Sequence, residues 1–146
     1  MKHISERVLE LPDAVIGEMF KAANEDKSII SMGAGQPDFK TPKPILDYAK
    51  KIIYKSSSYS NPAGLLELRR DIAKKLRKEN KINTADEDNV IVTAGSQQAL
   101  FVSLMCTLDP GEQAIIPNPG YLAYVPAVDL FNGSIAYVKL LEEEGF

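Results

Sequence analysis

The sequence predicts an α/β fold with a mainly parallel sheet, of which this chain supplies an incomplete part. In its second half, short apolar runs alternate with helical patterns, and the connections between them are short. Small residues follow directly where two of these runs end, which is where ligands bind in such sheets. A parallel sheet needs both of its faces covered, and three or four strands with a few helices form only a small part of such a fold. We therefore expect this chain to be the front part of a longer protein.

The first half of the chain is predicted to be mostly helical. Apolar residues recur with the 3.6-residue period of an amphipathic helix in three segments, and one short apolar run is a strand candidate. Prolines and polar residues indicate irregular chain between these segments. The expected helices cover 11–23, 45–54 and 65–80, the strand covers 29–32, and the irregular segments are 36–44 and 56–64.

The second half is predicted to alternate strictly between strands and helices. Each strand candidate is a short apolar run, and turn residues separate the elements, as in Asp109-Pro110-Gly111 and Asn132-Gly133. The expected strands cover 90–92, 114–116 and 135–138, and the expected helices cover 97–108 and 121–131.

The bulk composition excludes several classes of protein. The chain has 146 residues, 45% of them hydrophobic and 25% charged, as in ordinary globular domains. The net charge of -3 gives no general attraction to nucleic acid or anionic membranes. The single Cys106 excludes an intrachain disulfide framework. No apolar run is long enough for a membrane span and no signal peptide is visible, so a cytoplasmic protein is expected.

A possible anion site lies where the expected strand 90–92 runs into a helix through Gly95, Ser96 and Gln97. A helix N-terminus has about four unpaired N–H groups and a partial positive charge. A glycine at this point lets an anion approach the backbone, and a serine can donate its hydroxyl, so the turn could hold a phosphate. The alternative is that Ser96 simply caps the helix of an ordinary α/β connection.

Other candidate residues carry weaker signals. Gly33-Ala34-Gly35 lacks the third glycine and the following helix of a dinucleotide-binding motif, so Gly35 is expected at a tight turn or a close approach to a ligand. Tyr59 and Tyr121 lie beside glycine or proline in loops, either as ligand contacts or as packing residues. The helical pattern around Cys106 favours a core thiol over a nucleophile. No catalytic triad or cluster of metal ligands is visible.

Five segments, taken in order, resemble the N-terminal portion of class I and class II aminotransferases, which are fold-type I enzymes that use pyridoxal 5′-phosphate. They are "GAGQPDF" (33–39), "YSNPAGLLELR" (59–69), "VIVTAGSQQAL" (90–100), "LDPGEQAIIPNPGY" (108–121) and "EEEGF" (142–146). The resemblance implies a three-layer α/β/α fold. It also implies that 1–44 form an N-terminal arm with part of a small domain, and that 45–146 begin the large cofactor-binding domain.

The same resemblance assigns roles to the residues already singled out. The turn at 95–97 is similar to the cradle for the cofactor phosphate. Tyr121 matches the aromatic residue that stacks on the cofactor ring, and Tyr59 matches a tyrosine that reaches the cofactor phosphate of the other subunit in a homodimer. Gly35 matches a backbone position near the substrate carboxylate.

The resemblance also implies what this chain lacks. The family's Schiff-base lysine, the aspartate at the pyridinium nitrogen and the carboxylate-binding arginine lie in later segments, and Lys40, Lys55 and Lys139 do not stand in the matching context. The 146 residues alone are therefore expected not to transaminate. The whole enzyme is expected to transfer an amino group between an amino acid and a 2-oxo acid in a ping-pong reaction. Two alternatives are a lyase or synthase with the same cofactor and a non-catalytic fragment that binds a partner chain.

Overall fold

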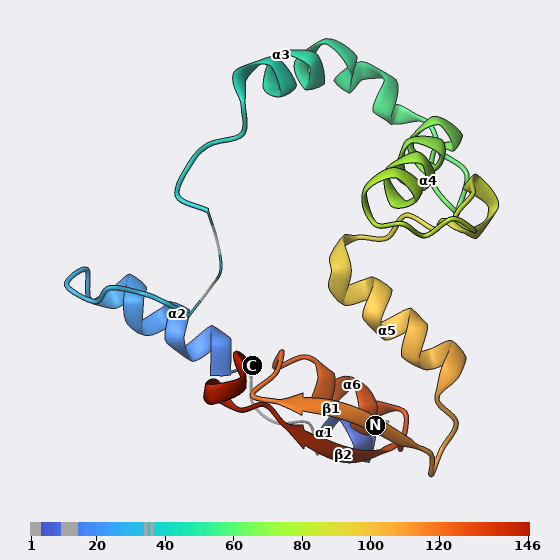
Figure 1. The fold of residues 1–146 in the computed structure, drawn as a ribbon. Helices are drawn as coiled ribbons and strands as arrows, with labels where there is room; N and C mark the ends of the chain where they lie inside the picture. Colours follow the sequence, from blue (N-terminus) through green and yellow to red (C-terminus); the bar gives the residue numbers. More distant parts are fainter. Residues whose placement is uncertain (1–3, 10–14, 34, 36) are drawn as a thin grey trace.

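A computed structural model describes residues 4–9, 15–33, 35 and 37–146 of the chain. The elements follow one another along an open curve, with α2 and α5 on opposite sides of its centre (Figure 1). In chain order they are α1 (Glu6–Leu9), α2 (Val15–Glu25), α3 (Lys43–Ile52), the 3₁₀ helix η1 (Ile53–Ser57), α4 (Leu66–Glu79), η2 (Glu87–Asn89), α5 (Gly95–Thr107), β1 (Gln113–Asn118), α6 (Tyr124–Leu130), β2 (Ser134–Lys139) and η3 (Glu142–Glu144).

The two strands form a parallel pair, which confirms the predicted α/β class. Gln113 lies opposite Ser134 at one end of the pair, and Asn118 lies opposite Lys139 at the other. A parallel pair needs a crossover connection, and α6 lies in that connection and packs against both strands. The expected order of strand, helix and strand within residues 114–138 is therefore confirmed.

One packed cluster lies between the sheet, α6 and α5. Val128 of α6 is 1% exposed and Ile116 of β1 is 5% exposed. The rings of Phe101 and Phe131 approach with centroids 5.0 Å apart, which joins α5 to the end of α6. Gly133 is packed so closely that an added Cβ would lie 2.7 Å from Leu108 Cδ2. This cluster therefore holds α5 against α6 and the turn before β2.

A second cluster joins α4 to the turn around η2. Ala73 of α4 is fully buried, and Ala85 and Val90 on either side of η2 are 7% and 8% exposed. Asp86 and Asn89 close η2 with a reciprocal capping box, in which each side chain accepts a backbone N–H of the other residue. The chain therefore leaves η2 in a defined direction towards α5.

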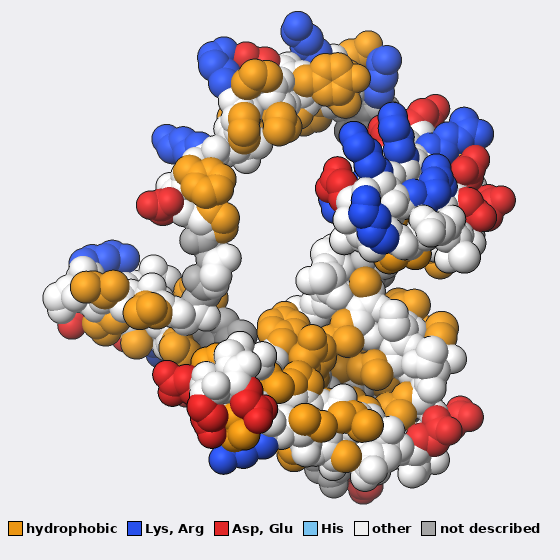
Figure 2. Space-filling model, viewed as in Figure 1, with side chains coloured by type: hydrophobic (Ala, Val, Ile, Leu, Met, Phe, Trp, Pro, Cys, Tyr) orange, Lys and Arg blue, Asp and Glu red, His pale blue; other side chains and the backbone are white. Residues whose placement is uncertain are grey.

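The described residues do not enclose one core. Its accessible surface is 12729 Å², whereas a compact monomer of 16.1 kDa exposes about 7,400 Å². Apolar side chains cover much of the lower part of the space-filling view, and the centre of the curve is open (Figure 2). Ile115 and Val138, which the register places on the sheet face opposite to Ile116, are 73% and 49% exposed. Parallel sheets normally have both faces covered, so this surface is suited to further packing.

Two expected strands are wrong. Residues 29–32 and 90–92 form no ladder, because within the described residues only β1 and β2 pair with each other. An apolar run becomes a strand only beside a partner, and sequence periodicity does not reveal the partner. Of the expected helix 11–23, the first four residues, 11–14, lie outside the described residues, and α2 continues two residues beyond the expected end, to Glu25. No helix in the described part of the chain has the length and apolar character needed to cross a membrane.

Candidate functional site

The turn that begins α5 is built by hydrogen bonds between its own residues. Gly95 has φ +78°, a left-handed conformation that favours glycine, and it begins the helix two residues before the predicted start. The Gly95 N–H donates to Thr93 O at 2.9 Å, and the Thr93 hydroxyl donates to Gly95 O at 2.9 Å. The Gln98 side chain accepts the Ala94 N–H. The backbone just before the helix is therefore fixed, with its donors already used.

The next two donors are free. Among the described residues, nothing accepts the N–H groups of Ser96 and Gln97, the second and third residues of α5. The first turn carries no acidic residue, and no charged residue occurs anywhere in 90–107. An added Cβ on Gly95 would meet no atom within 4 Å. Open space, unpaired donors and the helix dipole make this turn suitable for an anion such as a phosphate.

The alternative role of Ser96 as the helix cap is wrong. The capping position belongs to Ala94, and no side-chain capping bond is present there. Because α5 starts earlier than predicted, Ser96 lies inside the first helical turn, next to the free donors. Its hydroxyl is thus placed to add a further donor to the same anion.

The Tyr59 loop lies against the segment that leads into this turn. The Val92 N–H donates to Ala63 O at 2.9 Å, which ties the loop to the chain three residues before Gly95. Gly64 has φ +104°, and an added Cβ there would lie 2.6 Å from Val92 Cγ2. The fold therefore joins two of the predicted site segments, 59–64 and 95–97, through Val92.

Tyr59 itself points away from the rest of the chain. Its side chain is as exposed as in an isolated residue, at 106% of the reference area. The Tyr59 ring is therefore free of contacts with the described residues, and its cross-subunit role stays a prediction.

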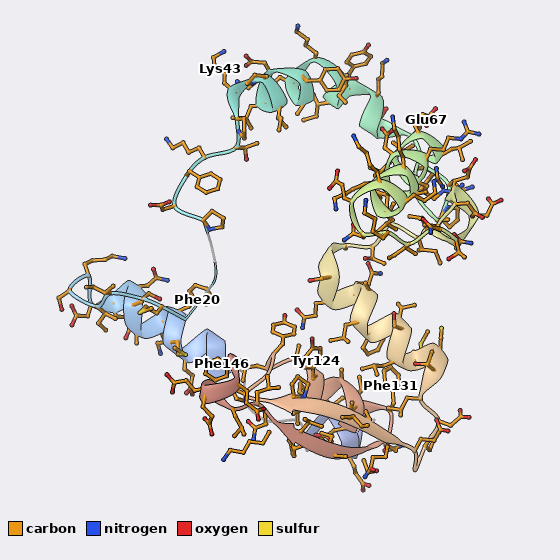
Figure 3. The ribbon with its side chains drawn as sticks, viewed as in Figure 1. Phe20, Lys43, Glu67, Tyr124, Phe131 and Phe146 are labelled. Atoms are coloured by element: carbon orange, nitrogen blue, oxygen red, sulfur yellow. The ribbon has the colours of Figure 1, made fainter. Side chains whose placement is uncertain are left out.

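Tyr121 lies at the carboxyl end of β1, where ligands bind in α/β sheets. α6 begins at Tyr124 rather than at the predicted 121, so Tyr121 remains in the turn before the helix. The ring of Tyr124 meets it edge to face at 5.6 Å, and Figure 3 shows Tyr124 above the strands. Tyr121 is 49% exposed, which leaves ring surface for a flat ligand.

Gly35 is not brought to the turn at 95–97 by the described part of the structure. It is exposed, lies in the coil after α2, and would have no atom within 4 Å of an added Cβ. Figure 1 shows α2, which precedes this coil, on the other side of the open centre from α5. Residues 34 and 36 lie outside the described residues. The expected role of Gly35 beside a substrate therefore stays a prediction.

Some contributors to the site were not expected. Thr93 and Gln98 fix the turn, and Tyr124 supports Tyr121. In the sequence, Thr93 and Gln98 are a hydroxyl and an amide residue on either side of Gly95. Tyr124 is a second tyrosine, three residues after Tyr121. Cys106 is exposed, so its expected place in a core is wrong for this chain, because nothing described covers that side of α5. The described residues hold no cluster of metal ligands.

The family described as "Aminotransferase class I and II" matches residues 27–146. A probable aspartate aminotransferase of Methanocaldococcus jannaschii is 36% identical over 140 residues, which are 95% of this chain and 36% of that protein. An aromatic-amino-acid aminotransferase of Thermococcus litoralis is 35% identical over 98% of this chain and 37% of its own length.

The fold agrees with solved structures as well. The aspartate aminotransferase of Thermus thermophilus with maleate superposes with a TM-score of 0.90 at 32% identity, covering 99% of this chain and 39% of that one. The open course of the elements is therefore the course that these segments follow in a longer chain. This chain spans less than two fifths of the length of the relatives it matches. It belongs to the class I and II aminotransferase family.

Proposed function

We propose that this chain supplies the cofactor phosphate cup and the ring-stacking wall of an amino-acid aminotransferase that uses pyridoxal 5′-phosphate. The observation that carries the proposal is the pair of unpaired N–H groups at Ser96 and Gln97, behind a left-handed Gly95, in a chain of this family. In the whole protein the amino group passes from an amino acid to a 2-oxo acid in a ping-pong reaction. The cofactor, when bound, supplies the carbonyl and the electron-withdrawing ring for this chemistry.

Each site residue then has a defined task. The N–H groups of Ser96 and Gln97 and the Ser96 hydroxyl bind the phosphate. The absence of a side chain at Gly95 lets the phosphate reach the backbone. The Tyr121 ring lies against one face of the cofactor and holds it at the carboxyl end of β1. The backbone at Gly35 meets the substrate carboxylate. Residues 1–44 form the N-terminal arm and part of the small domain, and residues 45–146 form the first part of the large domain.

The proposal is tested by the product that the full-length protein forms. Amino acids of the acidic and aromatic classes are each supplied with and without 2-oxoglutarate, because relatives are named for aspartate and for aromatic amino acids. Formation of a 2-oxo acid that depends on 2-oxoglutarate supports amino transfer. Product that forms without the second oxo acid indicates the alternative, a lyase or synthase of the same fold. If neither the amino acid nor 2-oxoglutarate is converted, both the aminotransferase and the lyase or synthase are contradicted.

A second candidate function is assembly with another polypeptide without catalysis by this chain. The observation that favours it is the exposed surface of 12729 Å², which is far larger than that of a compact monomer. If this is the function, the 146-residue chain gains thermal stability and protection from proteolysis when it is mixed with its partner chain. The same chain bound to its partner would then show no amino transfer.

The first prediction concerns covalent cofactor attachment. The 146-residue chain is expected to form no fixed linkage between a lysine and pyridoxal 5′-phosphate, because no lysine stands in the matching context of the family. After incubation with the cofactor, borohydride reduction and peptide mass spectrometry should find no pyridoxyl group concentrated on one lysine. Stoichiometric labelling of a single lysine, with an absorbance band that survives dialysis, would contradict this.

The second prediction concerns Tyr59. Because its ring is fully exposed on a loop tied to Val92, Tyr59 is expected to contact the cofactor phosphate of the other subunit in a homodimer. Mixed dimers are prepared in which only one subunit carries Tyr59→Phe, and cofactor binding is measured for each subunit. The loss should appear in the subunit with the unchanged tyrosine. If the loss follows the changed subunit, the cross-subunit role is wrong.

A further inference from the structure

Two arginines of α4 hold the backbone of the turn that leads to the phosphate cradle. The Arg69 guanidinium donates through Nη1 to Glu87 O at 2.7 Å, and the Arg77 guanidinium donates through Nη1 to Ala85 O. Both hydrogen bonds are partly buried; the first spans 18 residues of the chain and the second spans 8. They hold carbonyl groups on the two sides of Asp86, at the start of η2. The arginines therefore fix where the chain turns towards α5.

The path from this turn to the cradle is short and has few other supports. Only eight positions separate Glu87 from Gly95, and no strand ladder holds 90–92 within the described part of the chain. The supports are the buried Val90 side chain and the hydrogen bond from the Val92 N–H to Ala63 O. A displacement of the Glu87 carbonyl would thus be carried along the chain to the free N–H groups at the start of α5.

Arg69 differs from its neighbour Arg70 in a way that points to a role beyond surface charge. Arg69 Nε is buried and has no acceptor among the described residues, and burying an unpaired polar atom is unfavourable. Arg70 instead forms an ion pair with the Glu87 carboxylate at 3.1 Å, and 58% of its side chain is exposed. The hydrogen bond from Arg70 lowers the pKa of Glu87. Two adjacent arginines therefore contact one residue, Arg69 at its backbone and Arg70 at its side chain.

We propose that Arg69, assisted by Arg77, is a positioning residue for the cofactor phosphate: it holds the Glu87 carbonyl so that the N–H groups of Ser96 and Gln97 converge on one anion. This inference rests on the proposed function of the turn at 95–97. It assigns a binding role to a helix that does not itself reach the cradle. Binding geometries of this kind depend on supporting groups that hold the contacting atoms within about 0.5 Å.

The experiment compares Arg69→Met with Arg70→Met in the full-length protein. Both changes remove one guanidinium from adjacent positions of α4 and leave a side chain of similar length. Each variant is titrated with pyridoxal 5′-phosphate and with pyridoxal, which lacks the phosphate. Amide hydrogen exchange of the peptide around 94–100 is measured in the cofactor-free protein, as a readout that needs no loaded enzyme.

Arg69→Met is expected to weaken binding of pyridoxal 5′-phosphate by about tenfold, with little effect on pyridoxal, because a charge-assisted hydrogen bond that orients the donors is lost. Amide exchange at 94–100 should become faster. Arg69→Lys, which keeps a cationic donor, should restore part of the preference for the phosphorylated compound. Arg70→Met should leave both affinities and the exchange rate unchanged.

Equal effects of Arg69→Met and Arg70→Met, or equal losses for the two compounds, would overturn the inference. If Arg69→Met does not fold, Asn89→Ala provides a second route, because it removes the acceptor for the Asp86 N–H in the same turn. That variant should also reduce binding of the phosphorylated compound selectively, and a loss for neither compound or for both would again overturn the inference.

Ser96→Ala separates the phosphate-binding role of the turn at 95–97 from the positioning role of Arg69. If the turn at 95–97 does not bind the phosphate, Ser96→Ala leaves the preference of the protein for the phosphorylated compound unchanged. If only the positioning role is wrong, Ser96→Ala reduces that preference while Arg69→Met matches Arg70→Met.

Discussion

Gly95→Val is expected to lower the affinity of the full-length protein for pyridoxal 5′-phosphate by more than about a hundredfold. Gly95 has φ +78°, and a β-branched residue is strongly disfavoured in the left-handed region. The structure leaves open space around its Cα, so the cost is not a clash within the chain. The new side chain would strain the turn and occupy the space through which a phosphate reaches the N–H groups of Ser96 and Gln97. Isothermal titration with the cofactor measures the loss.

Two further variants show whether this loss arises at the phosphate. Ser96→Ala removes one hydroxyl and keeps the backbone donors, so we expect a loss of about tenfold to a hundredfold. Gly95→Asn, which tolerates the left-handed conformation better than valine, should fall between the wild type and Gly95→Val. All three changes should affect pyridoxal far less than its phosphate. Equal losses for the two compounds would mean that the turn does not hold the phosphate.

Gly120→Ala is expected to displace Tyr121 and to weaken binding of both pyridoxal 5′-phosphate and pyridoxal. An added Cβ would lie 2.3 Å from Pro117 O, and a backbone atom at this distance has to move with its strand. We expect a destabilisation of about 1–3 kcal/mol, as for other overpacked sites. Thermal unfolding measures this loss, and the two titrations measure the effect on binding. Because Tyr121 is proposed to contact the ring that both compounds share, their affinities should fall together.

The control for this change is Gly111→Ala. Gly111 has φ +88° and open space around it, in the turn between α5 and β1, so alanine strains the backbone without meeting another atom. It should lower thermal stability and leave both affinities unchanged. Tyr121→Phe, which keeps the ring, should retain most of the binding. If Gly120→Ala selectively affected the phosphorylated compound, the assignment of Tyr121 to the cofactor ring would be wrong.

The helices that periodicity identified are those with a clear apolar stripe and local stop signals. The expected helix 65–80 agrees with α4 to within one residue at each end, and β1, α6 and β2 follow in the predicted order. The starts of α5 and α6 were less accurate, by two and three residues. In α5 the left-handed Gly95 and the hydrogen bonds of Thr93 and Gln98 open the helix earlier, and such turn geometry is weakly encoded in residue type.

The sequence by itself indicated the family, the α/β class, and two strands at 114–116 and 135–138 with a helix between them. It also placed the glycine turn at 95–97 after an apolar run, and the role of that turn as a phosphate cradle stays a prediction. These features depend on local patterns and on short motifs kept in order. Only the tertiary structure decided that 29–32 and 90–92 lack strand partners here, that Ser96 is not the cap, and that Tyr59 is fully exposed. The tertiary structure also placed Arg69 on the Glu87 carbonyl, 18 residues away. Each of these depends on contacts between segments distant along the chain, which local patterns do not specify.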